Sequence, residues 1–185
     1  MNERRFSGDI ERLRLPERLE RMEVTRVVDL CLQGLAAPEK SPLSVLDVGV
    51  GSGVFAEAFA ARGLLVAGVD VNPEMIPAAQ AYVPQGDFRQ APAEAIPFPD
   101  AAFDLVFLGL VFHETDDALK ALQEARRLAR QRAAILEWPY EEQPFGPPLA
   151  HRVQPEALQA LAHQAGFRSA AAQRLANLAL YLLES

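Results

Sequence analysis

The chain has 185 residues, half of them hydrophobic and 23% charged, which suits one globular domain with a sizeable core rather than two domains. The net charge of −7 argues against a nucleic-acid surface, and no apolar stretch is long enough to cross a membrane or to form a signal peptide. A cytoplasmic protein is therefore expected. The single cysteine, Cys31, excludes an intrachain disulfide and a cysteine-based metal cluster.

Helical and strand-like segments alternate along the chain. The first predicted helix, 16–35, opens at Pro16 and carries an apolar stripe at helical spacing that includes Cys31, which is therefore expected to be buried. The segments that follow are strand 44–48, helix 53–62, strand 64–70, helix 73–82, strand 86–89, strand 103–109, a helix from Asp116 or Asp117 with Arg126, Arg127 and Arg130 in its last turns, strand 133–137, helix 155–165, and a hairpin of 167–175 with 178–183.

Repeated strand–helix units of this kind predict an α/β fold: a doubly wound, mostly parallel sheet with helices on both faces. We expect one domain over residues 1–185. Within it, residues 1–43 form an N-terminal helical cap and residues 44–185 form a Rossmann-like core.

Three glycines, Gly49, Gly51 and Gly53, follow the first strand directly and lead into a helix. In an open α/β sheet, ligands bind beyond the carboxyl ends of the strands, and glycines there let the backbone approach a ligand. Asp70 ends the next strand, where a carboxylate can accept hydrogen bonds from both hydroxyls of a ribose. The set predicts a nucleoside-bearing ligand; the alternative is a loop of glycines beside a solvated aspartate.

Two further residues distinguish between nucleoside cofactors. A dinucleotide-binding fingerprint requires a small residue at the position of Val54. Asp47 places a negative charge just before the turn, where it would repel a pyrophosphate. Negative charge suits a cationic or amino group instead. Both observations favour S-adenosylmethionine over a nicotinamide cofactor.

Three stretches carry a family resemblance: residues 46–53 (Leu-Asp-Val-Gly-Val-Gly-Ser-Gly), residues 69–72 (Val-Asp-Val-Asn), and residues 93–100 followed by Phe-Asp-Leu-Val at 103–106. The first two are similar to the first and second motifs of the class I S-adenosylmethionine-dependent methyltransferases. The third resembles their ubiquinone/menaquinone-biosynthesis-like (methyltransferase type 11) branch. The resemblance implies a seven-stranded sheet with an antiparallel last strand.

The resemblance also implies positions for the cofactor. Asp47 and the turn from Gly49 to Gly53 would hold the methionine part, Asp70 the ribose, and Val71 and Met75 the adenine, although Met75 suits helix packing equally well. Pro92 stands where the branch often has an aspartate that meets the adenine amino group, and the backbone N–H of Ala93 could still contact the adenine ring. The full set of implied cofactor-binding residues is Asp47, Gly49, Val50, Gly51, Gly53, Asp70, Val71, Met75, Ala93, Glu94 and Leu110.

Catalytic assistance is expected from His113, which follows the strand 103–109. Methyl transfer depends on alignment and needs a general base only when the acceptor must lose a proton. His113 is the best candidate for that base, because an imidazole is largely neutral near pH 7. The alternatives are that His113 caps the loop or hydrogen-bonds beside the cofactor.

The next strand ends at Glu137, and a proline-rich loop carries Tyr140, His151 and Arg152, which are candidates for binding the acceptor. The alternative is a rigid loop that packs its aromatic side chains on the sheet. His163 lies on a predicted helix and is expected to be exposed. Three dispersed histidines without ligand spacing give no metal site.

The predicted function is methyl transfer from S-adenosylmethionine to an unidentified, small-molecule acceptor, with S-adenosylhomocysteine as product. A non-catalytic S-adenosylmethionine-binding module of the same fold and a nicotinamide-dependent oxidoreductase are the alternatives. No nucleic-acid or membrane partner is expected, and nothing in the sequence specifies an oligomeric state.

Overall fold

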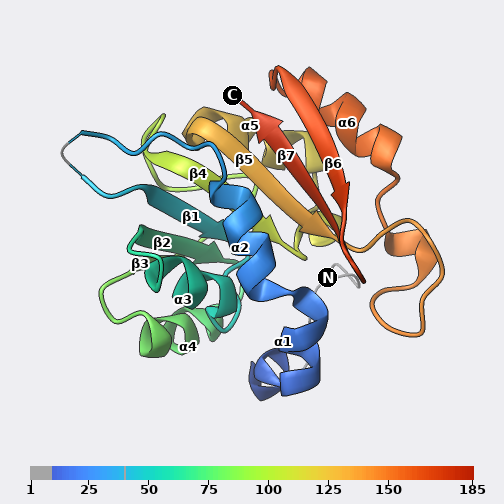
Figure 1. Cartoon of the computed structure of the whole chain (residues 1–185), viewed down its shortest axis with the longest axis horizontal. Helices are drawn as coiled ribbons and strands as arrows, with labels where there is room; N and C mark the ends of the chain where they lie inside the picture. The colour runs from blue at the N-terminus through green and yellow to red at the C-terminus, as the bar shows by residue number, and fades with distance from the viewer. Residues whose placement is uncertain (1–9, 40) are drawn as a thin grey trace.

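In a computed structural model, residues 10–39 and 41–185 are described, and they build a seven-stranded sheet with helices on both faces (Figure 1). The strand order is β3-β2-β1-β4-β5-β7-β6. Neighbouring strands pair in parallel from β3 to β5, and β7 runs antiparallel to both β5 and β6. The predicted fold class is confirmed. The strands are β1 Ser44–Val48, β2 Leu65–Asp70, β3 Asp87–Gln90, β4 Phe103–Gly109, β5 Ala129–Glu137, β6 Ser169–Arg174 and β7 Ala179–Glu184.

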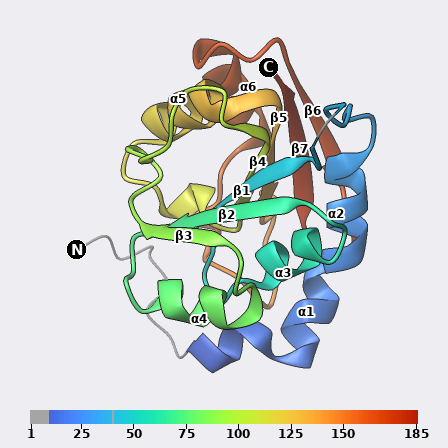
Figure 2. The same cartoon turned by 90° about the vertical axis from the view of Figure 1, so that its left-hand side faces the viewer.

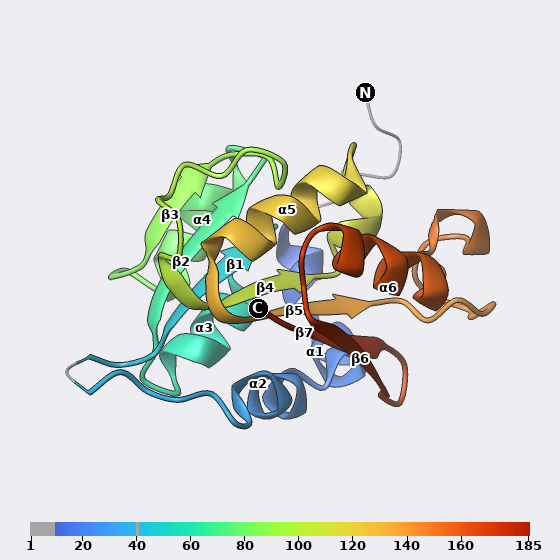
Figure 3. The ribbon, with the colours of Figure 1, turned by 90° about the horizontal axis from the view of Figure 1, so that it is seen from above.

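The helices form a layer on each face of the sheet. Seen from above, α5 and α6 lie on one side of the strands, and α2 and α3 lie on the other (Figure 3). The view in Figure 2 shows α4 beside α3 and β3. The α-helices are α1 Pro16–Met22, α2 Val24–Leu32, α3 Val54–Ala60, α4 Met75–Tyr82, α5 Ala118–Leu128 and α6 Pro155–Gln164; the short 3-10 helices are η1 Ile10–Arg14, η2 Phe112–Glu114 and η3 Leu149–His151.

The central strands are buried on both faces, as the continuous apolar runs predicted. Along β1, Leu46 and Val48 pack in the hydrophobic cluster that includes α5 and α6, whereas Val45 packs in the cluster that includes α2 and α3. Cys31 of α2 is fully buried in the second cluster, and burial raises the pKa of its thiol to about 12. Its predicted role as a small buried residue is confirmed.

The predicted first helix, 16–35, is wrong in one respect, because it is two helices. Glu23 adopts a left-handed conformation (φ 47°) between α1 and α2, which turns the chain. Its carboxylate is anchored on both sides, accepting from the backbone N–H of Ala176 (2.8 Å) and from Arg26 (2.7 Å). This tertiary anchor, which has no local sequence signature, offsets the strain of a left-handed residue.

Several other boundaries differ from prediction, and two of these differences change the place of a named residue. The helix α4 begins at Met75, because the side chain of Asn72 accepts the N–H of Glu74 in a turn before the helix. The strand β5 begins at Ala129, so Arg130 lies on the strand and not in the last turn of α5.

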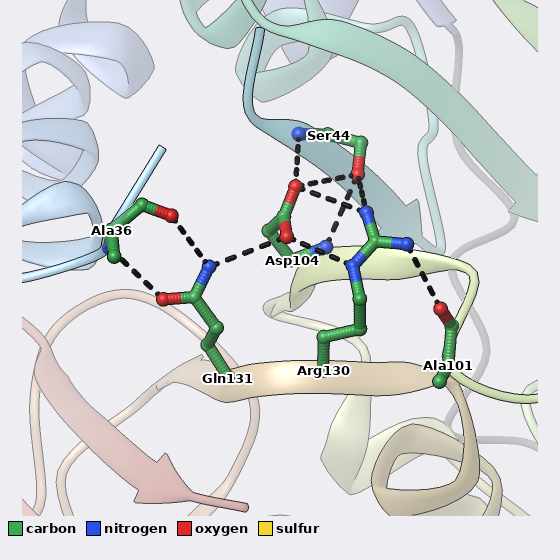
Figure 4. Close-up of polar contacts among 6 residues, drawn as sticks. All are labelled: Ala36, Ser44, Ala101, Asp104, Arg130 and Gln131. Atoms are coloured by element: carbon green, nitrogen blue, oxygen red, sulfur yellow. Dashed lines mark hydrogen bonds and ion pairs between the residues drawn. The ribbon is translucent and has the colours of Figure 1, made fainter. Parts of the chain in front are cut away.

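Arg130 belongs to a polar cluster that joins β1, β4 and β5 at the ends opposite the glycine turn (Figure 4). The carboxylate of Asp104 accepts from Arg130 Nε (2.9 Å), from Ser44 N and Oγ (both 2.9 Å) and from Gln131 Nε2 (3.3 Å). Gln131 also exchanges two hydrogen bonds of 2.9 Å with the backbone of Ala36, in the segment after α2. The cluster fixes these strand ends and attaches the N-terminal helices to them.

No helix among residues 10–39 and 41–185 is both long and apolar enough to cross a membrane. The part of the chain that the structure describes also contains no group of three or more His, Cys, Asp or Glu side chains arranged to hold a metal ion. The first nine residues of the predicted N-terminal cap lie outside the described residues.

Candidate functional site

A cavity of about 350 Å³ lies at the carboxyl ends of the parallel strands, where the fold class predicts a ligand site. Its walls come from the segments that follow β1, β2, β3, β4 and β5, and from η1 and α1 of the N-terminal segment. The predicted site residues that line it are Asp47, Gly49, Val50, Gly51, Asp70, Val71, Met75, Ala93, Glu94, Leu110 and His113.

The glycine turn and Asp70 form one hydrogen-bonded unit. Asp70 Oδ2 accepts the backbone N–H of Gly51 and Oδ1 accepts that of Asn72, both at 2.9 Å. Gly49 has φ 70°, and a Cβ on it would lie 2.5 Å from Cγ2 of Val111, so no other residue fits there. The turn is thereby held tightly against the end of β4.

Gly53 has a different place from the other two glycines. It is not among the residues that line the cavity; a Cβ on it would lie 3.0 Å from Cα of Ala79 in α4. Gly53 therefore permits α3 and α4 to pack closely behind the turn.

Asp47 is 2% exposed at the end of β1. Burial raises the pKa of its carboxyl to about 8; a hydrogen bond from the Ala56 amide opposes this shift and the nearby charge of Asp70 adds to it. Burial likewise raises the pKa of Asp70, against the hydrogen bonds that it accepts from backbone amides. Two adjacent carboxyls with raised pKa values favour a ligand that brings positive charge.

The opposite wall is built from β2, α4 and the segment after β3. Met75 is buried and Val71 is exposed, and both line the cavity together with Pro92 and Ala93. Glu94 Oε1 accepts the backbone N–H groups of Asp116 (2.7 Å) and Asp117 (3.2 Å). Glu94 thus ties this wall to the segment between η2 and α5.

Leu110, directly after β4, has a positive φ of 59° although it is not a glycine. Its N–H donates to the carbonyl of Leu136 (2.8 Å), so the strained residue is held by β5. Strain of this kind concentrates at functional sites. It directs the chain into η2, which carries His113.

His113 and Glu137 form a buried pair at the ends of β4 and β5. His113 Nδ1 lies 2.8 Å and 3.0 Å from the two carboxylate oxygens of Glu137, and the backbone N–H groups of His113 and Trp138 each donate to that carboxylate at 3.0 Å. The other ring nitrogen, Nε2, lies 3.8 Å from Glu114. Burial lowers the pKa of His113, but the charge and hydrogen bond of Glu137 and the charge of Glu114 outweigh it, so the pKa is raised.

The three loop residues predicted to bind an acceptor do not line the cavity. Tyr140 is exposed, and His151 lies in η3. Arg152 is buried, and its guanidinium donates to the carbonyls of Pro139, Glu141, Phe145 and Pro147 and to the side chain of Gln143 at 2.7–3.1 Å. Arg152 therefore shapes the loop 139–147 from behind. The fourth predicted acceptor residue, Glu137, is 1% exposed and contacts His113 instead of lining the cavity.

The cavity wall also contains residues outside the predicted site set. Trp138 lines it with Gly146 and Pro147, and Gly146 packs flat on the indole, where a Cβ would lie 2.7 Å from the ring. Arg18 and Met22 of α1 line it as well. Trp138 was recognisable as an aromatic residue at a strand end, whereas Arg18 carried no signal beyond its place in an arginine-rich segment.

Comparisons with known proteins agree with this geometry. The family described as "Methyltransferase domain" matches residues 46–136. A demethylmenaquinone methyltransferase from Thermus thermophilus is 37% identical over 122 residues, which cover 62% of this chain and 53% of that protein. A malonyl-[acyl-carrier protein] O-methyltransferase from Erwinia billingiae is 34% identical over 109 residues, covering 58% and 43%. The chain thus spans about half the length of these curated relatives.

A solved structure extends the likeness to nearly the whole chain. The crystal structure of a SAM-dependent methyltransferase from Aquifex aeolicus superposes with a TM-score of 0.82 at 27% identity, covering 95% of this chain and 96% of that one. The glycine turn, the acid at the end of β2 and the strand order of the sheet agree with this result. The chain belongs to the class I S-adenosylmethionine-dependent methyltransferases, and S-adenosylmethionine is the cofactor of that family.

Proposed function

We propose that this chain transfers the methyl group of S-adenosylmethionine to a small-molecule acceptor, and that His113, oriented by Glu137, takes the proton that the acceptor loses. The single observation that supports the second part is the buried contact between His113 Nδ1 and the Glu137 carboxylate (2.8 Å). It makes this histidine an oriented base instead of a loop cap.

The residues of the cavity fit the cofactor. Asp70 offers a carboxylate at a strand end for the ribose hydroxyls, and the side-chain-free backbone of Gly49 and Gly51 lines the cavity beside it. Asp47 and Asp70 provide the acidic surroundings that a sulfonium and an ammonium group require. When bound, S-adenosylmethionine supplies a methyl group on a positively charged sulfur and leaves as S-adenosylhomocysteine.

The tautomer of His113 follows from its partner. An ionised carboxylate can only accept hydrogen bonds, so Glu137 requires the ring hydrogen on Nδ1 and leaves a lone pair on Nε2. His113 lines the cavity and its Nδ1 contacts Glu137, so Nε2 is the nitrogen available for a proton from an acceptor hydroxyl or amine. Glu137 then stabilises the imidazolium that forms.

Other residues align the acceptor. The indole of Trp138 and the side chain of Met22 give this side of the cavity an apolar wall, which suits a small organic molecule. The two curated relatives, a demethylmenaquinone methyltransferase and a malonyl-[acyl-carrier protein] O-methyltransferase, support an organic acceptor of this kind.

A screen with isotopically labelled S-adenosylmethionine against small hydroxyl- and amine-bearing compounds tests this proposal. For the acceptor found, His113→Gln should lower kcat by roughly 10²–10⁴-fold, the usual contribution of a general base. The dissociation constant for S-adenosylhomocysteine should stay unchanged. The matched control is His163→Gln, since His163 is exposed on α6.

Normal turnover in His113→Gln would mean that catalysis depends on the alignment of donor and acceptor and that His113 is not a general base. Binding of NADH without binding of S-adenosylhomocysteine would contradict the cofactor and favour the oxidoreductase alternative.

A further inference from the structure

Two side chains of the cavity wall have buried polar atoms without a hydrogen-bond partner. Among the described residues, only Arg18 Nε, Ser52 Oγ and Ser185 Oγ are buried and unpaired, and the first two line the same cavity. Buried polar groups in folded proteins are nearly always paired. Two unpaired groups on one cavity therefore mark a place where a ligand group belongs.

The segments that carry these two atoms are bonded to one another. Arg14 donates from Nε (3.2 Å) and Nη2 (3.1 Å) to the carbonyl of Ser52, and its guanidinium stacks on Tyr82 with 3.2 Å to the ring centroid. Arg18 follows Arg14 by four residues, in α1. Leu13 packs on the glycine turn from the same side, since a Cβ on Gly51 would meet its Cδ1 at 3.4 Å. Arg18 and Ser52 are thus held on adjoining parts of the wall.

Both groups can donate a hydrogen bond, so they suit a ligand that carries an anionic oxygen. A guanidinium only donates hydrogen bonds, and its planar fork matches the two oxygens of a carboxylate. The hydroxyl of Ser52 can donate to the same group. Burial and the charge of Arg21 lower the pKa of Arg18, against the charge of Glu114, so an anion beside Arg18 would stabilise its charged form.

The charges that line the cavity favour an anion with a single negative charge. Arg18 is the only arginine or lysine among the described residues that line it, whereas Asp47, Asp70, Glu94 and Glu114 are all acidic. One guanidinium in these surroundings suits a single negative charge better than a phosphate with two. Among the groups of S-adenosylmethionine, the carboxylate of the methionine part is the one that meets this description.

We propose that Arg18 and Ser52 form the subsite for the carboxylate of the methionine part of the methyl donor. This inference rests on the donor site of the proposed function and is independent of the role of His113. It makes α1 part of the cofactor site, and it means that the chain selects S-adenosylmethionine against a donor that lacks the carboxylate. Asp47, which also lines the cavity, is then available to the cationic groups of the methyl donor.

Calorimetric titration with two ligands tests the subsite directly. S-adenosylhomocysteine carries the carboxylate, whereas 5′-methylthioadenosine keeps the nucleoside and the sulfur but lacks the amino-acid part. Arg18→Met should weaken S-adenosylhomocysteine binding by roughly 10- to 100-fold, the range for hydrogen bonds to charged groups, and leave 5′-methylthioadenosine binding unchanged. Ser52→Ala should give a smaller loss with the same selectivity.

A matched control lies in the same segment. Arg12 is exposed in η1 and does not line the cavity, so Arg12→Met should leave the binding of both ligands unchanged. Arg18→Lys, which keeps the charge but loses the planar fork, should restore part of the affinity for S-adenosylhomocysteine.

Two results would overturn the subsite. Equal weakening of both ligands in Arg18→Met would show a structural role of Arg18, and unchanged S-adenosylhomocysteine binding would place the carboxylate elsewhere. Either result leaves the donor site of the wild-type chain standing. Failure of the wild-type chain to bind S-adenosylhomocysteine would overturn both this subsite and the proposed function.

Discussion

Glu137 holds His113 at two points, because Oε1 accepts both the backbone N–H (3.0 Å) and the ring Nδ1–H (2.8 Å) of that residue. Twenty-four residues separate the two along the chain, and the parallel pairing of β4 with β5 brings them together. The histidine is therefore fixed in position and in tautomer by one side chain, which also contributes to its raised pKa.

The first prediction concerns the titration of this pair. Since Glu137 and Glu114 raise the pKa of His113 despite burial, the ring should lose its proton above the ordinary value of about 6.5. A general base works when deprotonated, so kcat/KM should rise with pH through that raised pKa. Glu137→Gln should move both the ring titration, followed by NMR of the labelled imidazole, and the acid limb of the rate to lower pH.

The control for this prediction is Glu142→Gln, which replaces an exposed carboxylate in the loop after β5 with a carboxamide. It should leave the titration of His113 where it is in the wild type. An unchanged titration in Glu137→Gln as well would show that Glu137 does not set the charge of the ring.

The second prediction concerns Asp70. Its two oxygens each hold one backbone N–H, of Gly51 and Asn72, while the resemblance assigns it the ribose. Asp70→Ala should weaken S-adenosylhomocysteine binding by about 1.5–3 kcal/mol, measured by calorimetry. Asp29→Ala, at an exposed position on α2, is the control. Unchanged affinity in Asp70→Ala would remove the ribose assignment.

The third prediction concerns Asp47 and proton release. In the free protein, burial raises its pKa to about 8, so the carboxyl is largely neutral at pH 7. A cationic ligand beside it favours the ionised form and lowers that pKa. Binding should therefore release a proton, and the affinity for S-adenosylmethionine should increase with pH up to about 8 and then level off.

Calorimetry in buffers of different ionisation enthalpy measures this proton directly. Asp47→Asn cannot ionise, and its affinity should lose the pH dependence. Binding of S-adenosylmethionine to the wild type without proton release at pH 7 would contradict a neutral Asp47.

Much of this architecture follows from local sequence patterns. The strand β4 was predicted with its observed bounds, and its apolar run 105–108 suits a strand that is buried on both faces. The glycine turn and Asp70 were predicted to share one site, because carboxyl ends of neighbouring parallel strands meet at one edge of the sheet.

The remaining features depend on contacts between distant residues. From the sequence, Glu137 was predicted to be a strand-end acid that faces an acceptor, and only the pairing of β4 with β5 brings it to His113. Arg152 was predicted to bind the acceptor, but the carbonyls of a proline-rich loop surround it. The break at Glu23 arises from its contact with Ala176, which is 153 residues away. No local pattern carries that information.

The fourth prediction follows from the five acceptors around Arg152, of which four are backbone carbonyls. Arg152→Met should lower the free energy of unfolding by ~3 kcal/mol, since it leaves one buried and three partly buried carbonyls without their donor. Because Gly146 and Pro147 line the cavity, the variant should also raise KM for the acceptor. Urea denaturation measures the loss of stability, limited proteolysis follows the loop 139–147, and steady-state kinetics with the acceptor measure KM.

Arg62→Met, a replacement on the surface ion pair with Asp29, serves as the control and should change the unfolding free energy by less than about 1 kcal/mol. Equal stability of Arg152→Met and the wild type would mean that the loop holds its shape without the guanidinium.

The fifth prediction concerns acid stability and the cluster at the other end of the sheet. Burial would raise the pKa of Asp104, but hydrogen bonds from Arg130, Ser44 and Gln131 outweigh it and lower the pKa to about 2. Because the folded pKa lies below the unfolded value of 3.8, the stabilisation is complete above that value and is lost as the pH falls toward 2. Asp104→Asn should lower the unfolding free energy near neutral pH by about 2 kcal/mol and flatten its slope between pH 4 and 2, as followed by urea denaturation at a series of pH values.

Asp100→Asn is the matched control, because Asp100 also pairs with an arginine, Arg127, but its side chain is 79% exposed, so its loss should change stability little. An equal acid slope in Asp104→Asn and the wild type would show that this cluster does not set the acid limit of the fold.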